Sequence, residues 1–342
     1  MLEPNPGMLA RARRQRLQSG LDLTLLDLLG EKIRKPARYC LQPCNNVSRD
    51  ALYNFPMSRI LVIGATGRVG RQVVAQLPGN LEVRALARNP QSAHLPPHIE
   101  VVPGDLTAPE SLPAALRGTD AVFLVWTAPP ATIAPVIQQI ATHARRIVLL
   151  SSPHQTPHPL FQQPNPLARM HAQIEKTIAS AGLSWTFLRP GMFSANARDW
   201  WASAIRAGLP VRWPYLSAPT APIDERDIAA IAVRALCAAD NDAAPAGRDY
   251  VLTGPESLTQ REQIEILGRA TGRQIRTEEL SPDQARRELR TLFPAPAIDM
   301  LLNAWAAALG QPALVTHTFA ELTNAAPHTF AQWATDNAAF FL

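Results

Sequence analysis

Residues 59–70, with the sequence Arg-Ile-Leu-Val-Ile-Gly-Ala-Thr-Gly-Arg-Val-Gly, constrain the fold of this chain more than any other stretch. The apolar run 60–63 is rich in β-branched residues, which predicts a short buried strand. Apolar residues then recur at helical spacing after Gly70, at Val73, Val74 and Leu77. The glycines between these two patterns are spaced Gly-x-x-Gly-x-x-Gly. The stretch therefore predicts a strand, a glycine-rich turn and a helix.

A turn of this kind places backbone N–H groups at a helix N-terminus, where the helix dipole also favours an anion. Gly64 suits the tight turn, Gly67 lets the backbone approach a pyrophosphate, and Gly70 lets helix and strand pack closely. No Lys-Ser or Lys-Thr pair follows the glycines, which excludes a phosphate loop of the Walker type. The context of strand and helix predicts a dinucleotide-binding turn.

Strand and helix patterns alternate from Met57 onward. We expect strands at 60–63, 81–87, 99–102, 121–126, 147–150 and 184–188, with helices after Gly70 and at 111–116, 135–144 and 168–181. This alternation predicts an α/β fold, a doubly wound parallel sheet with helices on both faces. The pattern loosens beyond Gly191, where we expect a helix within 222–237, a strand at 250–252, a helix at 258–271 and further helices within 282–309.

These patterns predict three segments. Residues 57–255 form the nucleotide-binding domain, of which 191–217 contribute to a substrate cleft, and residues 256–342 form a smaller, mainly helical substrate region. Residues 1–56 differ from the rest, because they hold nine Lys and Arg against five Asp and Glu, and prolines interrupt their leucine pattern. We interpret them as a poorly ordered extension.

Residues 57–342 hold 24 basic against 23 acidic residues, so their net charge is close to zero. This excludes a nucleic-acid binder, which needs a basic surface.

The composition also predicts a compartment. Three cysteines (Cys40, Cys44 and Cys237) cannot make a disulfide framework, which indicates a reducing environment. No apolar run reaches the length of a membrane span and no signal-peptide pattern opens the chain. We therefore expect a cytoplasmic protein that does not bind membranes. His154 and His158 share a proline-rich loop without an evident third ligand, so no metal is expected.

Several motifs together resemble one family. The glycine motif at 64–70, Leu-Ala-Arg-Asn-Pro at 86–90, Gly-Asp-Leu at 104–106 and Ser-Trp-Thr-Phe-Leu-Arg-Pro-Gly-Met-Phe at 184–193 resemble the NmrA-like branch of the atypical short-chain dehydrogenases. The resemblance covers roughly residues 57–255. It implies a Rossmann fold and an NAD(P) cofactor. The branch includes NAD(P)H-dependent quinone and azo-dye reductases, ergot-alkaloid reductases and proteins that only sense dinucleotides, so both activities stay open.

The residues after the second and third strands bear on the choice of cofactor. Arg88 suits the 2′-phosphate of NADP, and no Asp or Glu lies between Leu86 and Glu100 to bind the 2′-hydroxyl of NAD; a solvated loop arginine is the alternative. By resemblance, Asp105 contacts the adenine edge, although an ordinary turn aspartate fits as well. The expected cofactor is NADP, with NADPH preferred over NADH. The expected cofactor-binding residues are Gly64, Thr66, Gly67, Arg68, Val69, Gly70, Arg88, Asp105, Leu106, Trp126 and Thr127.

The Tyr-x-x-x-Lys pair of most short-chain dehydrogenases is absent. Lys176 is the only lysine after Met57, and the residue four positions before it is Ala172. His171 precedes Glu175 by four residues, and the quinone reductases of the branch show a similar His-x-x-x-Glu. A histidine with a pKa near 6.5 is able to donate a proton at neutral pH. We therefore expect His171, Ser151 and Ser152 as catalytic residues, with a surface or capping histidine as the alternative.

An aromatic cluster suggests the kind of substrate. Trp185, Trp200, Trp201, Trp213 and Tyr215 lie near Met192 and Phe193 in the sequence, and we expect part of this cluster to face a cleft suited to a flat apolar molecule. The first hypothesis is an NADPH-dependent oxidoreductase of a quinone, imine or azo compound. The second is a non-catalytic dinucleotide sensor with a regulatory protein partner. A homodimer is open under either hypothesis.

Overall fold

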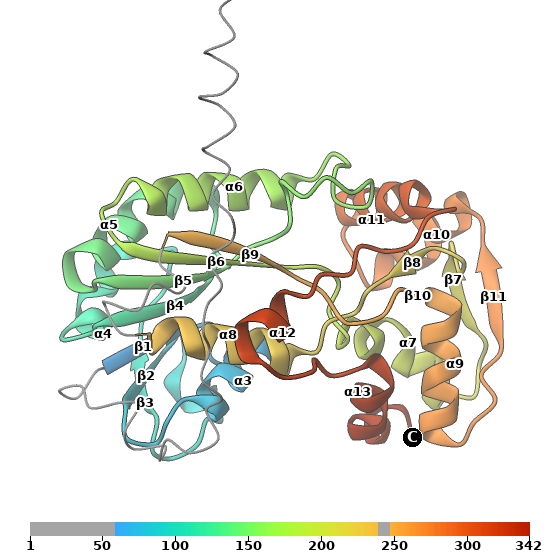
Figure 1. Cartoon of the computed structure of the whole chain (residues 1–342), viewed down its shortest axis with the longest axis horizontal. Coiled ribbons are helices and arrows are strands. Elements are labelled where there is room, and N and C mark those ends of the chain that lie inside the picture. Colours follow the sequence, from blue (N-terminus) through green and yellow to red (C-terminus); the bar gives the residue numbers. More distant parts are fainter. Residues whose placement is uncertain (1–58, 239–246) are drawn as a thin grey trace, which may run out of the picture. The chain divides into compact units, whose positions relative to one another are not determined.

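The computed structural model describes residues 59–238 and 247–342, which belong to one compact unit. Within these residues a parallel sheet of seven strands has the order β3-β2-β1-β4-β5-β6-β9 (Figure 1). The strands are β1 (Arg59–Ile63), β2 (Glu82–Ala87), β3 (Glu100–Pro103), β4 (Ala121–Val125), β5 (Arg146–Leu150), β6 (Ser184–Pro190) and β9 (Arg248–Leu252). The strand order reverses between β1 and β4, as in a doubly wound Rossmann fold, which confirms the predicted fold class.

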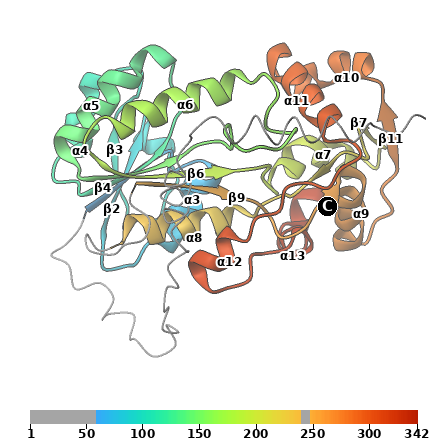
Figure 2. The same ribbon diagram turned by 45° about the horizontal axis from the view of Figure 1, so that its top comes forward.

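Helices cover both faces of this sheet (Figure 2). One face packs against α3 (Arg68–Gln76) and α8 (Glu225–Leu236), and the other against α4 (Pro113–Leu116), α5 (Ile133–His143) and α6 (Pro166–Ala179). Alternate residues of β1 serve the two faces, with Ile60 and Val62 on the α3 side and Leu61 and Ile63 on the α5 side. The near-continuous apolar strands therefore follow from burial on both faces.

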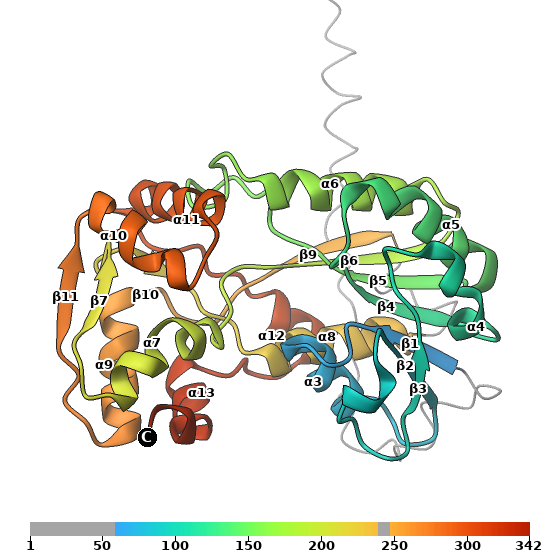
Figure 3. The same ribbon diagram turned by 180° about the vertical axis from the view of Figure 1, so that it is seen from behind.

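A second apolar core lies beyond the carboxyl ends of β6 and β9 (Figure 3). It is built from α7 (Asn196–Arg206), β7 (Val211–Pro214), β8 (Pro219–Thr220), β10 (Leu258–Thr259), α9 (Gln260–Thr271), β11 (Thr277–Leu280), α10 (Pro282–Glu288), α11 (Ala295–Ala308) and α13 (Phe330–Asp336). β7 pairs with β11 in parallel, and β8 pairs with β10 antiparallel. Trp201, Trp213 and Trp305 are fully buried at its centre. The remaining elements are α12 (Thr318–Thr323) and short 3-10 turns at Pro90–Ser92, Pro109–Ser111, Pro130–Thr132, Leu289–Thr291 and Ala338–Phe341.

The chain passes between the two cores more than once. After β6 it builds α7, β7 and β8, then returns to the sheet for α8 and β9, and leaves again with β10. Residues 195–218 therefore share one apolar core with residues 264–341. The division of the chain at residue 255 stays a prediction.

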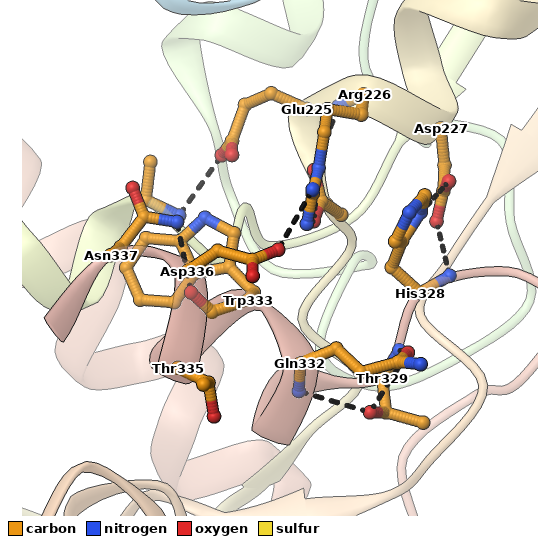
Figure 4. Close-up of polar contacts among 12 residues, drawn as sticks. Glu225, Arg226, Asp227, His328, Thr329, Gln332, Trp333, Thr335, Asp336 and Asn337 are labelled. Carbon is orange, nitrogen blue, oxygen red and sulfur yellow. Dashed lines mark hydrogen bonds and ion pairs between the residues drawn. The ribbon is translucent and has the colours of Figure 1, made fainter. Parts of the chain in front are cut away.

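The N-terminus of α8 holds the last segment of the chain (Figure 4). The buried carboxylate of Asp227 accepts a hydrogen bond from the backbone N–H of His328 at 2.8 Å, and its second oxygen lies 2.6 Å from Nδ1 of that ring. Arg226 bridges Asp224, the N-cap of α8, and Asp336 of α13. The ion pair with Asp336 holds α13, which belongs to the second core, against α8, which covers one face of the sheet. The two cores are therefore joined at this point.

The predicted N-terminal extension, residues 1–56, lies outside the described residues. Among the residues that the structure describes, no helix is both long and apolar enough to cross a membrane.

Candidate cofactor and substrate site

The glycine turn between β1 and α3 has the geometry that its sequence predicts. Gly64 has a φ of +90°, a conformation that side chains rarely adopt. A Cβ on Gly70 would lie 2.1 Å from the carbonyl oxygen of Gly64, so helix and strand approach too closely for any side chain. Helix α3 begins at Arg68 without a side-chain cap. The turn therefore presents a helix N-terminus to an anion.

A cavity of about 610 Å³ opens over this turn, at the carboxyl ends of β1, β2, β3 and β4. The residues predicted to bind the cofactor that line it are Gly64, Thr66, Gly67, Arg88, Asp105, Leu106 and Thr127. Parallel sheets of this type bind ligands at this edge, where the strand order reverses. Exposed glycine backbone, an uncapped helix and an arginine fit a bound dinucleotide.

Arg88 and Asp105 face this cavity from the ends of β2 and β3. The side chain of Asp105 accepts a hydrogen bond from the backbone N–H of Thr107 at 2.8 Å. This bond, together with the charge of Arg88, holds the pKa of Asp105 below its usual value. Asp105 is therefore ionised at neutral pH, and Arg88 is exposed at the cavity wall. Their contacts with adenosine stay predictions.

The other predicted cofactor residues are placed differently. Val69 and Gly70 are buried, and offer only their backbone. The guanidinium of Arg68 turns toward α7, where it donates to Asn196 at 3.2 Å and pairs with Asp199. Burial and the neighbouring Arg198 lower its pKa. This link between the glycine turn and the second core was not predicted from the sequence, and a phosphate contact of Arg68 stays a prediction.

A second cavity, of about 360 Å³, adjoins the first, since Val125 lines both. Three predicted catalytic residues, Ser151, Ser152 and His171, lie in its wall together with Trp126. The apolar part of the wall comes from Leu150, Pro153, Leu160, Phe161, Leu167, Pro190, Met192, Phe193, Met300, Leu301 and Ala304. Among the described residues that line it, none is a lysine or an arginine. The cavity is thus mainly apolar, with one small polar cluster and, apart from it, Asn165, the N-cap of α6, whose Oδ1 accepts a hydrogen bond from the backbone N–H of Ala168.

Ser152 and His171 form one half of this cluster. The Ser152 Oγ lies 2.9 Å from Nδ1 of His171. Burial lowers the pKa of His171 to about 4, although Glu175 acts in the opposite direction. The expected pKa near 6.5 is therefore wrong for the folded chain, because the sequence did not reveal that His171 is on the buried face of α6. At neutral pH His171 is uncharged and holds a single N–H proton.

Ser151 belongs to a separate network that sequence reasoning missed. Its hydroxyl donates to Oε1 of Glu175 at 2.5 Å, and Glu175 forms a buried ion pair with Arg189 of β6. The sequence indicated this network only through the four-residue spacing from His171 to Glu175. That spacing places both residues on one face of α6. His154 also lies here, with Nε2 3.5 Å from Glu175 and Nδ1 2.9 Å from the carbonyl of Ser152.

Of the aromatic cluster, Met192 and Phe193 line this cavity, as expected for part of it, whereas Trp185, Trp200, Trp201 and Trp213 do not. Trp201 and Trp213 are fully buried in the second core, and Trp200 stacks on Trp213 with ring centroids 5.3 Å apart. Helix α11 contributes Met300, Leu301 and Ala304 to the same wall. Tryptophans at these positions pack against one another because the second core needs large apolar side chains.

Comparison with known proteins agrees with this geometry. A family described as NAD(P)H-binding matches residues 64–239. A (4-alkanoyl-5-oxo-2,5-dihydrofuran-3-yl)methyl phosphate reductase from Streptomyces griseus is 37% identical over 82% of this chain and 99% of its own length. An NAD(P)H azoreductase from Xenophilus azovorans is 31% identical, again over 82% of this chain and 99% of its own length.

The fold is shared with solved structures as well. An NADPH-dependent quinone oxidoreductase from Escherichia coli superposes with a TM-score of 0.65, at 24% identity, over 81% of this chain and 98% of that one. The chain therefore belongs to the NAD(P)H-binding family, and it shares its fold with NmrA, a negative transcriptional regulator, at a TM-score of 0.64 and 15% identity. It is an NAD(P)H-dependent oxidoreductase, which confirms the first of the two hypotheses at this level.

Proposed function

We propose that this oxidoreductase transfers a hydride from NADPH to an uncharged, planar, electron-poor molecule such as a quinone, an imine or an azo compound. The observation that carries the proposal is the second cavity, which shares Val125 with the cofactor cavity and is mainly apolar, its polar residues being Ser151, Ser152, the neutral His171 and Asn165. An apolar cavity with few polar groups is typical of sites for small organic ligands. A substrate held there lies beside the place where the cofactor cavity ends.

The polar cluster favours an electron-poor acceptor. Reduction of an imine adds a hydride to carbon and a proton to nitrogen, and electron-poor acceptors need less acid assistance than simple ketones. Neither a Tyr-x-x-x-Lys pair nor a charged His171 is available at neutral pH to act as a strong acid. The proton comes from water, either directly or through the hydroxyl of Ser152 beside His171, which takes up a proton from water as it passes its own to the substrate.

The cavity wall also favours an uncharged substrate. The relative from Streptomyces griseus is named for a phosphate ester, but the described wall of the second cavity holds no lysine or arginine. A phosphate buried without a cation loses its hydration without compensation. We therefore expect little turnover with phosphate esters.

A homodimer or a regulatory protein partner stays a prediction.

Stopped-flow absorbance of enzyme-bound NADPH tests the substrate class. Mixing the complex with quinones, imines and azo dyes should oxidise the cofactor within a single turnover, and a phosphorylated analogue of the same ring should react more slowly. If bound NADPH stays reduced with every uncharged acceptor, the proposed substrate class is wrong. The oxidoreductase would then have to act on another class of acceptor.

Filling the second cavity should weaken substrate binding. Ala304 of α11 lines the cavity, whereas Ala306 of the same helix is exposed and does not. A forced contact costs about 1–3 kcal/mol, so Ala304→Trp should raise KM about five- to hundredfold and leave the Kd of NADPH unchanged. Ala306→Trp is the matched control and should behave as the wild type. Equal KM values for the two variants would remove α11 from the substrate site.

Arg88 should set the cofactor preference. A charge-assisted hydrogen bond contributes about 1.5–3 kcal/mol, so Arg88→Ala should reduce the preference for NADPH over NADH about ten- to hundredfold. Titration of both cofactors, followed by fluorescence, measures it. Arg117 is exposed and does not line the cavity, so Arg117→Ala should keep the preference of the wild type. A mutant at position 88 as selective as its parent would contradict the assignment.

A further inference from the structure

A buried ion pair lies against the polar cluster of the second cavity. Glu175 of α6 and Arg189 of β6 are each 5% exposed. Nε of Arg189 donates to Oε1 of Glu175 at 3.0 Å, and Nη2 donates to Oε2 at 2.5 Å. Nη1 of Arg189 also lies 3.0 Å from the carboxylate of Asp249 on β9. The guanidinium is held from two sides, and therefore fixes the orientation of the Glu175 carboxylate.

This carboxylate determines what Ser151 can offer. The Ser151 hydroxyl donates to Oε1 of Glu175, and the Ser151 backbone N–H donates to the carbonyl of Leu188 at 2.7 Å. An ionised carboxylate accepts hydrogen bonds and donates none, and a serine hydroxyl carries one proton. Because that proton is committed to Glu175, the Ser151 oxygen presents only lone pairs to a ligand in the cavity.

The neighbouring serine has the opposite property. Ser152 and the neutral His171 carry two protons between them, and the bond that joins them uses one. One O–H or N–H proton therefore remains for another partner, whichever tautomer the ring adopts. The two adjacent serines after β5 thus differ in role. Ser151 can only accept a hydrogen bond from a ligand, whereas Ser152 together with His171 can still donate one.

We propose that Ser151 accepts a hydrogen bond from the carboxamide N–H of the nicotinamide ring, and that Glu175 is the positioning residue that keeps Ser151 an acceptor. The reacting groups of quinones, azo compounds and N-substituted imines carry acceptors but no N–H or O–H, so they cannot donate to Ser151. A primary carboxamide carries two N–H donors. The inference rests on the proposed function in one respect. It requires that the nicotinamide end of the cofactor extends past Val125 into the second cavity.

The 3-acetylpyridine analogue of NADP⁺ tests this contact, since a methyl group replaces the carboxamide NH₂. Calorimetric titration of the full chain should give a Kd for NADP⁺ about three- to tenfold lower than that for the analogue. Ser151→Ala should bring the ratio of the two Kd values close to one. Glu175→Ala should lower the ratio too, because the Ser151 proton is released. A general structural defect weakens both ligands equally and leaves the ratio unchanged.

Ser152→Ala is the matched control, and should keep the ratio of the wild type. If Ser151→Ala also keeps that ratio, or if the wild type binds both ligands equally, the proposed contact is wrong. Should Glu175→Ala fail to fold, the two serine variants decide the matter. No turnover is measured, so an enzyme that reduces no quinone can still show the expected ratios. Failure to bind either nucleotide would instead overturn the proposed function.

Discussion

Replacing Gly70 by alanine should abolish tight cofactor binding. The new Cβ would meet the carbonyl oxygen of Gly64 at 2.1 Å and its carbonyl carbon at 2.7 Å, and both are backbone atoms that no side-chain rotation can move. The start of α3 must then shift away from β1. Overpacking of this kind costs about 3 kcal/mol, which corresponds to a loss of about a hundredfold in NADPH affinity if the turn absorbs it. Fluorescence titration with NADPH, with thermal unfolding in parallel, measures both effects.

Gly79, just beyond the same helix, provides the control. A Cβ at this position meets nothing within 4 Å, and Gly79 is not among the glycines with a positive φ. Gly79→Ala should therefore change neither NADPH affinity nor stability by more than about 0.5 kcal/mol. Full cofactor affinity in the Gly70→Ala variant would show that the close approach of α3 and β1 is dispensable for binding.

Acidification should destabilise the protein through His171. Its pKa is about 4 in the folded chain and about 6.5 when unfolded, so between these values only the unfolded chain binds the proton. This contribution to stability is complete above pH 6.5 and is lost as the pH falls toward 4. A difference of about 2.5 pKa units corresponds to about 3 kcal/mol in the free energy of unfolding. Urea unfolding between pH 7.5 and 4 measures the change.

The variant His171→Gln lacks this titration, so its free energy of unfolding should fall about 3 kcal/mol less than that of the wild type over the same range. His98→Gln removes an exposed histidine instead and should follow the wild-type curve. Parallel curves for wild type and His171→Gln would show that the ring is not held neutral by burial. This measurement needs neither cofactor nor substrate.

The sheet could be predicted because its signals are local. Strands β1, β4 and β5 are each almost entirely apolar, because they are buried between two layers of helices, and this leaves a nearly uninterrupted apolar run in the sequence. The capping box that Thr259 and Glu262 form at the start of α9 was visible in the same way. The second core was less visible. Strand β7 has only four residues, and its partner β11 begins at Thr277, so its pairing depends on contacts far along the chain.

The same distinction applies to the candidate site. The glycine turn and the residues after β2 and β3 are contiguous motifs, and the structure brings Gly64, Arg88 and Asp105 to one cavity. The second cavity depends on residues distant in sequence, such as Met192 and Met300 of α11, which both line it. The low pKa of His171 and the ion pair of Glu175 with Arg189 follow from burial by neighbouring elements, which no local pattern records.

The repeated passage of the chain between its two cores limits how its specificity can be exchanged with that of relatives. A chimera with a single junction near residue 255 would join α7 and β7 of one parent to α9, α11 and α13 of the other. Trp201 and Trp213 would then have to pack against a foreign partner in place of Trp305. Substitution of individual cavity residues, or transfer of both segments together, preserves that packing. In this fold, the wall of the second cavity comes from segments interleaved along the chain and not from one terminal module.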